Sequence, residues 1–460
     1  MSNAQNTLIK GKAHESYAGK IIELFSTIDY ITGTKQKENQ DTIDVNGYFE
    51  LSFHTDLTKS VTLKINQVIT KLYVEPNFVY GVIIPELNKS VDYQNGAELP
   101  VNISIVGADT TELNMMIFDY DSIYNNLFIP KNKKFISRTQ MFKLTDSLKK
   151  IYDIKLNKNK NQYFKSFINY SVASINSSLS RGENYLIQNY IINKPIQYNH
   201  QEYMQFFNSC FKGFLNDIAS SKEGESLYNI INIKSNYTLL NNYLKNDKYL
   251  KNDSLRELVI INNLWDFYFS SSFDADAIKN IITQLNLETK NNEHKAITDH
   301  MLAYFNKMQA GSLAPMFSAR SQNGAIGSLD NFKGKWVYIN FFSTKNIESL
   351  KEMSKILNLK KKYGVKIVFL SICLDDSLAD YKNYLKSNPK FDWQIWYNNE
   401  KSITKTAKEV YNVIGTEHYF LINNYGYLIQ SPALSPSKGI EFKLNIIFKP
   451  NKKTTKIGIR

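Results

Sequence analysis

The chain has 460 residues, of which 43% are hydrophobic, so it is long enough to bury more than one hydrophobic core. Its formal net charge is +13, but nearly all of the positive charge is lysine spread along the chain. That pattern favours a solvated surface and no nucleic-acid partner, with a basic face for an anionic polymer or a membrane surface as the alternative. No apolar run approaches the ~18 residues of a membrane span, so we expect no transmembrane helix.

Residues 5–108 predict a small antiparallel β-sandwich or barrel. Runs that alternate apolar and polar side chains, or that are rich in β-branched residues, indicate strands. These runs are Thr7–Lys12, Lys20–Tyr30, Asp41–His54, Ser60–Ile69, Lys71–Pro85 and Val101–Val106. The pair Asn46-Gly47 is typical of a tight hairpin turn between Ile43 and Phe49. The first domain is therefore expected to be all-β.

Residues 109–308 predict an all-α domain. Apolar side chains recur at helical spacing, for example from Phe164 to Ile175 and from Met204 to Phe214. Stretches rich in Asn and Lys separate these segments, and no fixed period relates them. We therefore expect helices with short connections and not a repeat array.

Two kinds of candidate side chain lie in this helical stretch. Cys210 shares an apolar helix face with Phe207 and Phe211, so we expect it to belong to the core. His294 and His300 are six residues apart, a spacing that matches no zinc-binding HExxH site. We expect both histidines to lie on the surface.

Residues 309–449 predict an α/β domain, followed by a basic tail over 450–460. The near-continuous apolar runs Lys335–Phe342 and Val365–Cys373 are typical of parallel strands buried on both faces. Helices and a further strand alternate with them, and a hairpin and a last helix follow. These elements are expected at Ile347–Leu357, Leu378–Leu385, Asp392–Tyr397, Ile403–Val413, Tyr419–Ile429 and Gly439–Ile447.

Six short segments of this last third occur in the order of one family's motifs. They are Ala314-Pro315-Met316-Phe317, Gly327 to Lys335, Ser371 to Asp375, Tyr411 to Gly415, Tyr419 to Ile422, and the turn at Gly426. Together they resemble the thioredoxin-like domains of exported bacterial thiol–disulfide oxidoreductases and alkyl hydroperoxide reductase-type proteins. The resemblance implies a thioredoxin-like fold for residues 309–449.

The catalytic motif of that family is altered. Where the family has Trp-Cys-x-x-Cys, this chain has Lys345 before Asn346 at the first cysteine position and Ser349 at the second. Glu417 stands where the family has its cis-proline, and cis bonds are essentially restricted to proline. Disulfide exchange needs a thiolate. We therefore expect no catalytic residue at these vestigial positions, and we lean towards a protein that is not an enzyme.

Three functional hypotheses stay open. The first is a redox-inactive protein with a binding or scaffolding role, in which a peptide or protein partner docks near the vestigial positions and His418. The second is a thiol–disulfide oxidoreductase or peroxidase that uses Cys373 with an external thiol, although Cys373 is expected to be a small buried strand residue. The third treats the helical middle as the functional part, with spacers on both sides.

A weaker resemblance covers the rest of the chain. Residues 41–49 and Leu72–Pro76 resemble the small β domain that precedes such thioredoxin-like domains in exported proteins of Bacteroidetes, and Asn193–Ile196 resembles a helical insert found in some of them. Ser2-Asn3-Ala4 after Met1 looks like a vector remnant, so we expect a removed signal peptide. The expected location is the periplasm or outer cell envelope, and a lipid anchor stays open. No nucleotide or metal motif occurs, so we expect no cofactor and no metal.

Overall fold

The computed structural model describes residues 6–66, 68–87, 99–128, 137–156, 161–220, 224–270, 272–375, 377–399, 406–411, 413, 416 and 418–448. The chain divides into two compact units, of which the first comprises Met1–Val91, Glu98–Asp266 and Asn280–Met301. The second comprises Asp92–Ala97, Phe267–Lys279 and Leu302–Arg460. Within the described ranges, the helices are too short or too polar to cross a membrane.

The first unit begins with two β-sheets that share one core. The strands are β1 (Thr7–Ala13), β2 (Ile21–Asp29), β3 (Thr34–Thr42), β4 (Tyr48–Phe53), β5 (Lys59–Ile65), β6 (Val68–Val74), β7 (Val79–Ile84), β8 (Leu99–Pro100) and β9 (Ser104–Val106). The sheet orders are β4-β1-β7-β9 and β3-β2-β5-β6-β8. Ile9 and Leu51 from the first sheet pack with Leu24 and Leu63 from the second. The expectation of a wholly antiparallel arrangement is wrong, because β1 with β7 and β6 with β8 pair in parallel.

Turns divide three of the predicted strands. The hairpin predicted at Asn46-Gly47 is wrong, because β3 pairs with β2 while β4 pairs with β1 in the other sheet. The Asp44 carboxylate accepts hydrogen bonds from the backbone N–H groups of Asn46 and Tyr48, which shapes a connection between sheets. Asn66 and Asn77 adopt positive φ angles of 53° and 58°, a conformation that Asn tolerates better than most residues. They end β5 and β6, where the sequence pattern predicted continuous strands.

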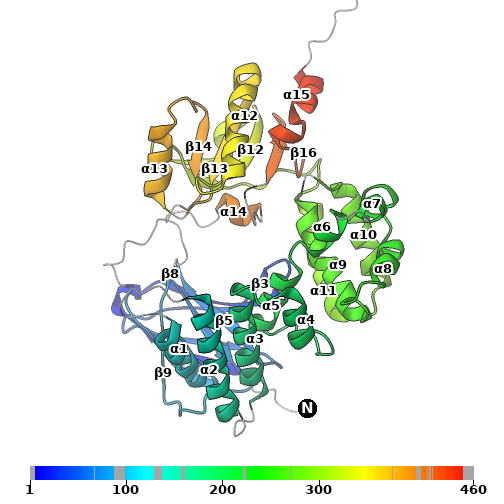
Figure 1. Cartoon of the computed structure of the whole chain (residues 1–460). Helices are drawn as coiled ribbons and strands as arrows, with labels where there is room; N and C mark the ends of the chain where they lie inside the picture. The colour runs from blue at the N-terminus through cyan, green and yellow to red at the C-terminus, as the bar shows by residue number, and fades with distance from the viewer. Residues whose placement is uncertain are drawn as a thin grey trace, which may run out of the picture. The chain divides into compact units, whose positions relative to one another are not determined.

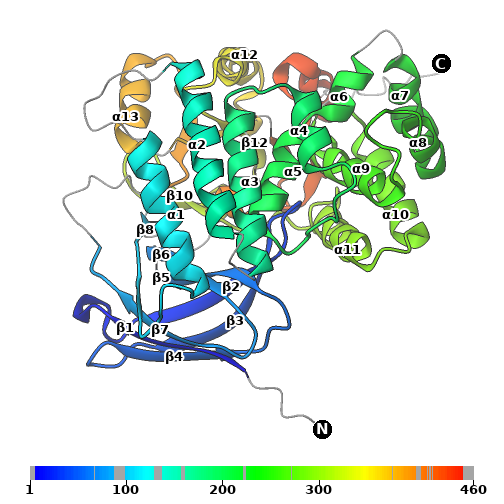
Figure 2. The same cartoon turned by 60° about the horizontal axis from the view of Figure 1, so that its bottom comes forward.

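Helices follow, as predicted for the middle of the chain. They are α1 (Leu113–Phe128), α2 (Arg138–Leu156), α3 (Gln162–Ser178), α4 (Glu183–Tyr190), α5 (Gln201–Phe211), α6 (Phe214–Ala219), α7 (Gly224–Asn229), α8 (Tyr237–Leu244), α9 (Asp253–Tyr268), α10 (Ala275–Glu288) and α11 (Asn292–Lys307). Tyr73 of β6 is part of the core formed by α1, α2 and α3. The sheet that contains β6 therefore shares a hydrophobic core with helices α1 to α3 in the first unit. Figure 2 shows these helices beside the blue strands.

His294 is buried, which contradicts the predicted surface position. Its side chain is 0% exposed, with Nδ1 2.6 Å from Oε1 of Glu257 and Nε2 2.7 Å from the hydroxyl of Tyr198. His300 is partly buried, with Nδ1 3.3 Å from Oδ2 of Asp29. These polar partners compensate the two rings for lost hydration, which is why histidine is tolerated at both positions.

The Glu257 network predicts a pH dependence of stability. Burial raises the pKa of Glu257, but hydrogen bonds from His294, Thr289 and Tyr237 more than offset burial and hold the pKa below its ordinary value. Since the folded-state pKa is the lower one, this contribution to stability is present above the unfolded pKa of about 4.3 and is lost as the pH falls through the folded pKa. As the pH falls from about 5 to about 3, we expect the free energy of unfolding to decrease less in Glu257→Gln than in the unsubstituted chain. Urea unfolding at each pH measures this difference. Glu50→Gln, at an exposed pair with Lys10, should keep the original profile.

The second unit contains an α/β layer. Its elements are β10 (Ser318–Arg320), β11 (Ile326–Ser328), β12 (Trp336–Phe342), α12 (Ile347–Tyr363), β13 (Ile367–Cys373), α13 (Leu378–Ser387), β14 (Gln394–Tyr397), α14 (Ala407–Val410), β15 (Tyr419–Ile422), β16 (Leu428–Gln430) and α15 (Ile440–Phe448). The sheet order is β11-β10-β14-β13-β12-β15-β16, with β14, β13 and β12 parallel. Figure 1 shows α12 and α13 beside these strands. The β10–β11 hairpin was not predicted, because its strands are only three residues long.

Both faces of this sheet are covered, which explains the apolar run in β12. Tyr338 and Phe342 belong to one core, while Val337, Ile339 and Phe341 belong to the core on the opposite face. The predicted strands, the hairpin and the last helix all occur in this unit. Of the helix predicted over Ile403–Val413, α14 is present, while residues 400–405 and 412 lie outside the described residues, as does the predicted tail 450–460.

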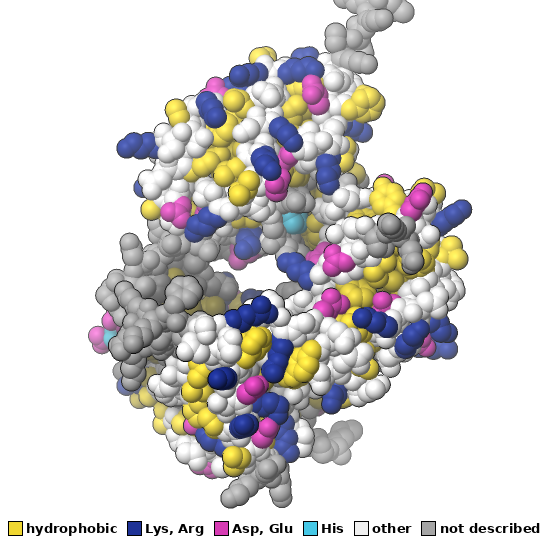
Figure 3. Space-filling view, in the orientation of Figure 1, with side chains coloured by type: hydrophobic (Ala, Val, Ile, Leu, Met, Phe, Trp, Pro, Cys, Tyr) yellow, Lys and Arg dark blue, Asp and Glu magenta, His cyan; other side chains and the backbone are white. Residues whose placement is uncertain are grey.

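Figure 3 shows how the charged side chains are distributed over one face of the molecule. On the face drawn in Figure 3, lysine and arginine side chains are interspersed with neutral and acidic ones. Several lysines pair with carboxylates on neighbouring helical turns, such as Lys149 with Asp153 at 2.7 Å. The sheet-rich regions and the helical middle are confirmed, while the boundaries placed at residues 108 and 308 stay predictions.

Candidate functional site

The candidate site lies where β12 ends and α12 begins, at the positions that match the altered motif. Asn346 caps α12, because its Oδ1 accepts a hydrogen bond of 2.9 Å from the N–H of Ser349. The Ser349 side chain is turned inward, and the residue is 5% exposed. Its hydroxyl lies 2.9 Å from the carbonyl oxygen of Ser343 and accepts from the Ser343 N–H at 3.2 Å. Both side chains therefore make structural hydrogen bonds within the chain.

A buried carboxylate from the next strand holds the same loop. Asp375 follows β13 and is 5% exposed. Its Oδ1 accepts from the hydroxyl of Ser343 at 2.5 Å, and its Oδ2 accepts from the N–H of Thr344 at 3.0 Å and also from the Thr344 hydroxyl. The loop before α12 is thus fixed from one side by Asp375 and from the other by Ser349.

The outer surface of this loop is exposed and is partly apolar. Lys345 is 69% exposed in its side chain, and its ammonium lies 3.3 Å from Oδ2 of Asp380. Ile347 is 71% exposed, although it is a large apolar residue. Single exposed apolar residues are common on protein surfaces, so Ile347 offers an apolar contact here but does not by itself mark a binding site.

A small polar cavity adjoins Ser349 inside the second unit. Its volume is about 160 Å³, enough for a few water molecules or one amino-acid side chain. Its lining combines hydroxyl groups with charges, and consists of Glu348, Ser349, Glu352, Thr416, Tyr419, Ser435, Ser437 and Lys438. Glu352 accepts from Lys355 Nζ at 3.1 Å and from the N–H of Ser437 at 3.0 Å, which ties α12 to the turn at Pro436–Lys438.

The two cysteines are poorly placed for thiolate chemistry. Cys373 is 0% exposed, and burial together with the nearby Asp375 carboxylate raises the pKa of its thiol. Cys210 is partly buried on α5, where burial raises the pKa of its thiol to about 12. Because the thiolate is the reactive form, both thiols are expected to react slowly in the folded protein.

Thiol labelling tests this expectation. In the Cys210→Ser variant, Cys373 is the remaining thiol, and we expect a disulfide reagent to label it slowly in buffer and at once in guanidinium. The rate is followed by release of the chromophoric thiol. Rapid labelling in buffer would contradict a buried Cys373 of raised pKa.

The other two predicted site residues are separated from this surface or lie outside the description. His418 is 5% exposed, and its ring lies 4.9 Å from that of Phe269, so its side chain is packed inside the second unit. Its carbonyl oxygen accepts from the N–H of Phe341 on β12. Glu417 lies outside the described residues, as does Gly415. The structure thus brings together Lys345, Asn346 and Ser349, whereas the side chains of Cys373 and His418 lie in the interior.

Sequence reasoning did not find the part played by Asp375. Asp375 belonged to a recognised motif, but its partners Ser343 and Thr344 precede it by about thirty residues, and no local pattern links them. The contributions of Ser435 and Ser437 to the cavity were missed for the same reason. The described side chains offer hydroxyls, carboxylates and ammonium groups at this surface, which can bind polar groups through hydrogen bonds and charge.

Known proteins are similar to parts of this chain. The curated thiol–disulfide oxidoreductase ResA of Bacillus thuringiensis subsp. konkukian is 36% identical over 128 residues, which are 27% of this chain and 69% of that protein. A thioredoxin-like protein from Bacteroides caccae matches 69% of this chain and 96% of its own, with 16% identity and a TM-score of 0.33. The thioredoxin domain of a thiol–disulfide oxidoreductase from Bacteroides vulgatus matches 30% of this chain and 98% of its own, with 21% identity and a TM-score of 0.28. No family model matches the chain.

Proposed function

Because the chain belongs to the family of thioredoxin-like thiol–disulfide oxidoreductases, we propose that it is a redox-inactive member of that family with a binding or scaffolding role. The observation that supports the proposal is that Asn346 and Ser349, at the two cysteine positions of the family motif, make hydrogen bonds within the chain. Asn346 caps α12, and Ser349 is hydrogen-bonded to the backbone of Ser343. Neither side chain forms a thiolate, and Cys373, the thiol of the same unit, is buried.

Insulin reduction tests the absence of redox activity. With dithiothreitol as the electron donor, the chain is expected to precipitate the insulin B chain no faster than a control without protein. Turnover above that control would overturn the proposal. An active thioredoxin run in parallel shows that the assay detects catalysis.

The alternative function places catalysis on Cys373 with an external thiol. A peroxidase or oxidoreductase of this kind needs an accessible thiolate, which the burial and raised pKa of Cys373 disfavour. We expect the chain to consume no hydrogen peroxide, and Cys373→Ser to change nothing. Peroxide consumption that Cys373→Ser abolishes would establish the alternative instead.

The surface around Ile347 is the proposed contact for a peptide or protein partner. The exposed isoleucine supplies an apolar contact, Lys345 supplies a charge, and the cavity beside Ser349 has room for one side chain. S-carboxymethylated insulin B chain, an extended peptide without a free thiol, is a suitable probe. We expect it to bind, and we expect Ile347→Glu to weaken binding by about tenfold, as for an interface anchor.

Val365 provides the matched control for that variant. It is also a fully exposed apolar residue, but it follows the other end of α12, on the order of 25 Å away along the helix. Val365→Glu should therefore leave binding unchanged. Equal effects of the two substitutions would contradict a site at the start of α12.

The proposal includes a location in the cell envelope, which rests on the resemblance to exported proteins. Fractionation of cells that produce the native gene product tests it. Recovery with cytoplasmic markers would contradict the location without affecting the redox assays.

A further inference from the structure

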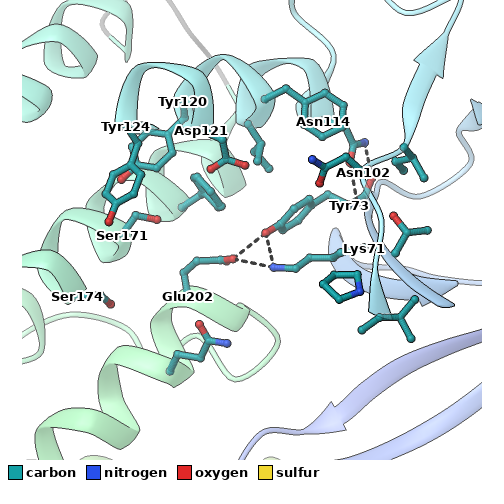
Figure 4. Close-up of a pocket in the computed structure, with 18 of the residues that line it drawn as sticks. Lys71, Tyr73, Asn102, Asn114, Tyr120, Asp121, Tyr124, Ser171, Ser174 and Glu202 are labelled. Carbon is teal, nitrogen blue, oxygen red and sulfur yellow. Dashed lines mark hydrogen bonds and ion pairs between the residues drawn. The ribbon is translucent and has the colours of Figure 1, made fainter. Parts of the chain in front are cut away.

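The first unit contains a larger pocket, which belongs to none of the sites described so far. It has a volume of about 590 Å³ and lies between β6, residues 100–103 and helices α1, α3 and α5. This volume falls in the range of small-molecule sites, which is about 300–1,000 Å³. Apolar side chains such as Ile117 and Phe167 form part of the wall, and the polar side chains labelled in Figure 4 come from β6, Asn102 and helices α1, α3 and α5.

Three of those polar side chains are linked to one another by hydrogen bonds and an ion pair. The hydroxyl of Tyr73 donates to Oε1 of Glu202 at 2.8 Å, and Lys71 Nζ donates to the Tyr73 hydroxyl at 2.9 Å. Lys71 Nζ also lies 3.7 Å from Glu202. The charge of Lys71 is therefore matched by Glu202 within the pocket wall.

Asp121 of α1 is the unmatched charge of the pocket. Among the described residues, none forms a hydrogen bond or an ion pair with its side chain, and Lys71 acts on it only at longer range. Asp121 is an exposed residue at the pocket, and partial burial of its carboxylate raises its pKa, Lys71 lowers it, and Glu202 raises it further. With one cation and two carboxylates, the pocket carries an excess of negative charge in a protein whose formal net charge is +13.

Two tyrosine rings lie on one side of this carboxylate (Figure 4). Tyr120 and Tyr124 come from the same helix as Asp121, with ring centroids 6.2 Å apart and planes 21° from parallel. Tyr124 is half-buried, and Figure 4 shows it on the Asp121 side of the pocket, next to Ser171. The negative face of an aromatic ring attracts cations, and the charge of a neighbouring carboxylate adds to that attraction.

We propose that this pocket binds a small organic ammonium ion, with its positive group at Asp121 and its apolar body against the wall that includes Ile117 and Phe167. An ammonium group has only donors, and the carboxylate and hydroxyl groups near Asp121 supply acceptors. An anion would meet two carboxylates and one already paired lysine. The volume accommodates a ring or short chain attached to the ammonium group.

Calorimetry with 2-phenylethylammonium tests the assignment on the full chain. We expect binding with a dissociation constant on the order of 1 mM, as for a small unoptimised ligand. Asp121→Asn should weaken it by about tenfold, the effect of one charge pair at intermediate dielectric. Tyr124→Leu, which keeps an apolar side chain, should weaken it by about threefold. The neutral analogue 2-phenylethanol should bind at least about tenfold more weakly than the ammonium ion.

Asp153→Asn is the matched control, because Asp153 is an exposed helical aspartate paired with Lys149 outside the pocket. It should bind the probe like the unsubstituted chain. The proposal is overturned if the probe does not bind, if Asp121→Asn binds it equally well, or if 2-phenylethanol binds equally tightly. Binding of a neutral disaccharide in place of the ammonium probe would also overturn it. Far-UV circular dichroism of each variant separates lost binding from lost fold.

Discussion

Replacing Asn346 and Ser349 together by cysteine is expected to give the chain a reducible disulfide and measurable insulin-reducing activity. The two positions are three residues apart at the start of α12, with Asn346 at the cap and Ser349 in the first turn. A thiol at a helix N-terminus has a lowered pKa, because the helix dipole and the free N–H groups stabilise the thiolate. We expect insulin reduction at least about tenfold above that of the unsubstituted chain, because the pair supplies a thiolate nucleophile and a resolving thiol that the unsubstituted chain lacks at these positions.

Single substitutions separate the roles of the two positions. Asn346→Cys alone supplies a nucleophile without a resolving partner, so it should form a mixed disulfide with glutathione but should not turn over. Ser349→Cys alone places a thiol where the residue is 5% exposed, and it should react slowly. Mass spectrometry before and after reduction counts the disulfides.

Two outcomes would contradict the reasoning. If the double variant folds but forms no disulfide, then Asn346 and Ser349 do not occupy the geometry of the family's cysteine pair. If the unsubstituted chain reduces insulin as fast as the double variant, then redox inactivity is wrong. The unsubstituted chain and the double variant therefore test the family geometry and the proposed function separately.

The buried strands were predictable because their sequence pattern does not depend on distant residues. Every residue of β12 after Trp336 is buried, so a continuous apolar run is required there whatever the packing partners are. All residues of β13 except the partly buried Val368 are buried as well, and helix α12 could be predicted from its apolar spacing. The vestigial positions Lys345, Asn346 and Ser349 were assigned from the order of the flanking segments, and this assignment stays a prediction.

The features that were missed depend on contacts between residues far apart in the sequence. His294 is a polar residue on a polar stretch, and its burial is possible only because Glu257 and Tyr198 lie against it. The turns at Asn66 and Asn77 depend on a backbone conformation that asparagine permits but does not require. The pocket at Asp121 needs a sheet and three helices to meet, which no single segment of the sequence indicates.

Asp375→Ala is expected to be the most destabilising single change at the candidate site. It removes the acceptor for the hydroxyl of Ser343 and for the N–H of Thr344, in a place where Asp375 is 5% exposed. Leaving such donors without a partner away from water costs about 1–3 kcal/mol each, so we expect a loss of about 3 kcal/mol for the second unit. Urea unfolding followed by tryptophan fluorescence measures it, since Trp336, Trp393 and Trp396 all lie in this unit.

Asp380→Ala is the control for that loss. Asp380 is also an acidic side chain near the loop, but it is 42% exposed and its partner Lys345 is 69% exposed. A surface pair of this kind contributes about 0–1 kcal/mol, so the control should stay close to the unsubstituted chain. Asp375→Asn should lie between the two, because the amide oxygen still accepts hydrogen bonds but carries no charge.

Hydrogen exchange shows whether the effect is local. In Asp375→Ala, the amides of Ser343 and Thr344 should exchange faster than those in the centre of β12, because the loop loses its carboxylate while the sheet keeps its hydrogen-bonded strands. The peptide probe should then bind less well, since Lys345 and Ile347 would no longer be held in one arrangement. Unchanged exchange in the loop would mean that Ser349 alone is sufficient to fix it. In that case the inward-turned serine, and not the buried aspartate, is the side chain that holds the loop before α12 in place.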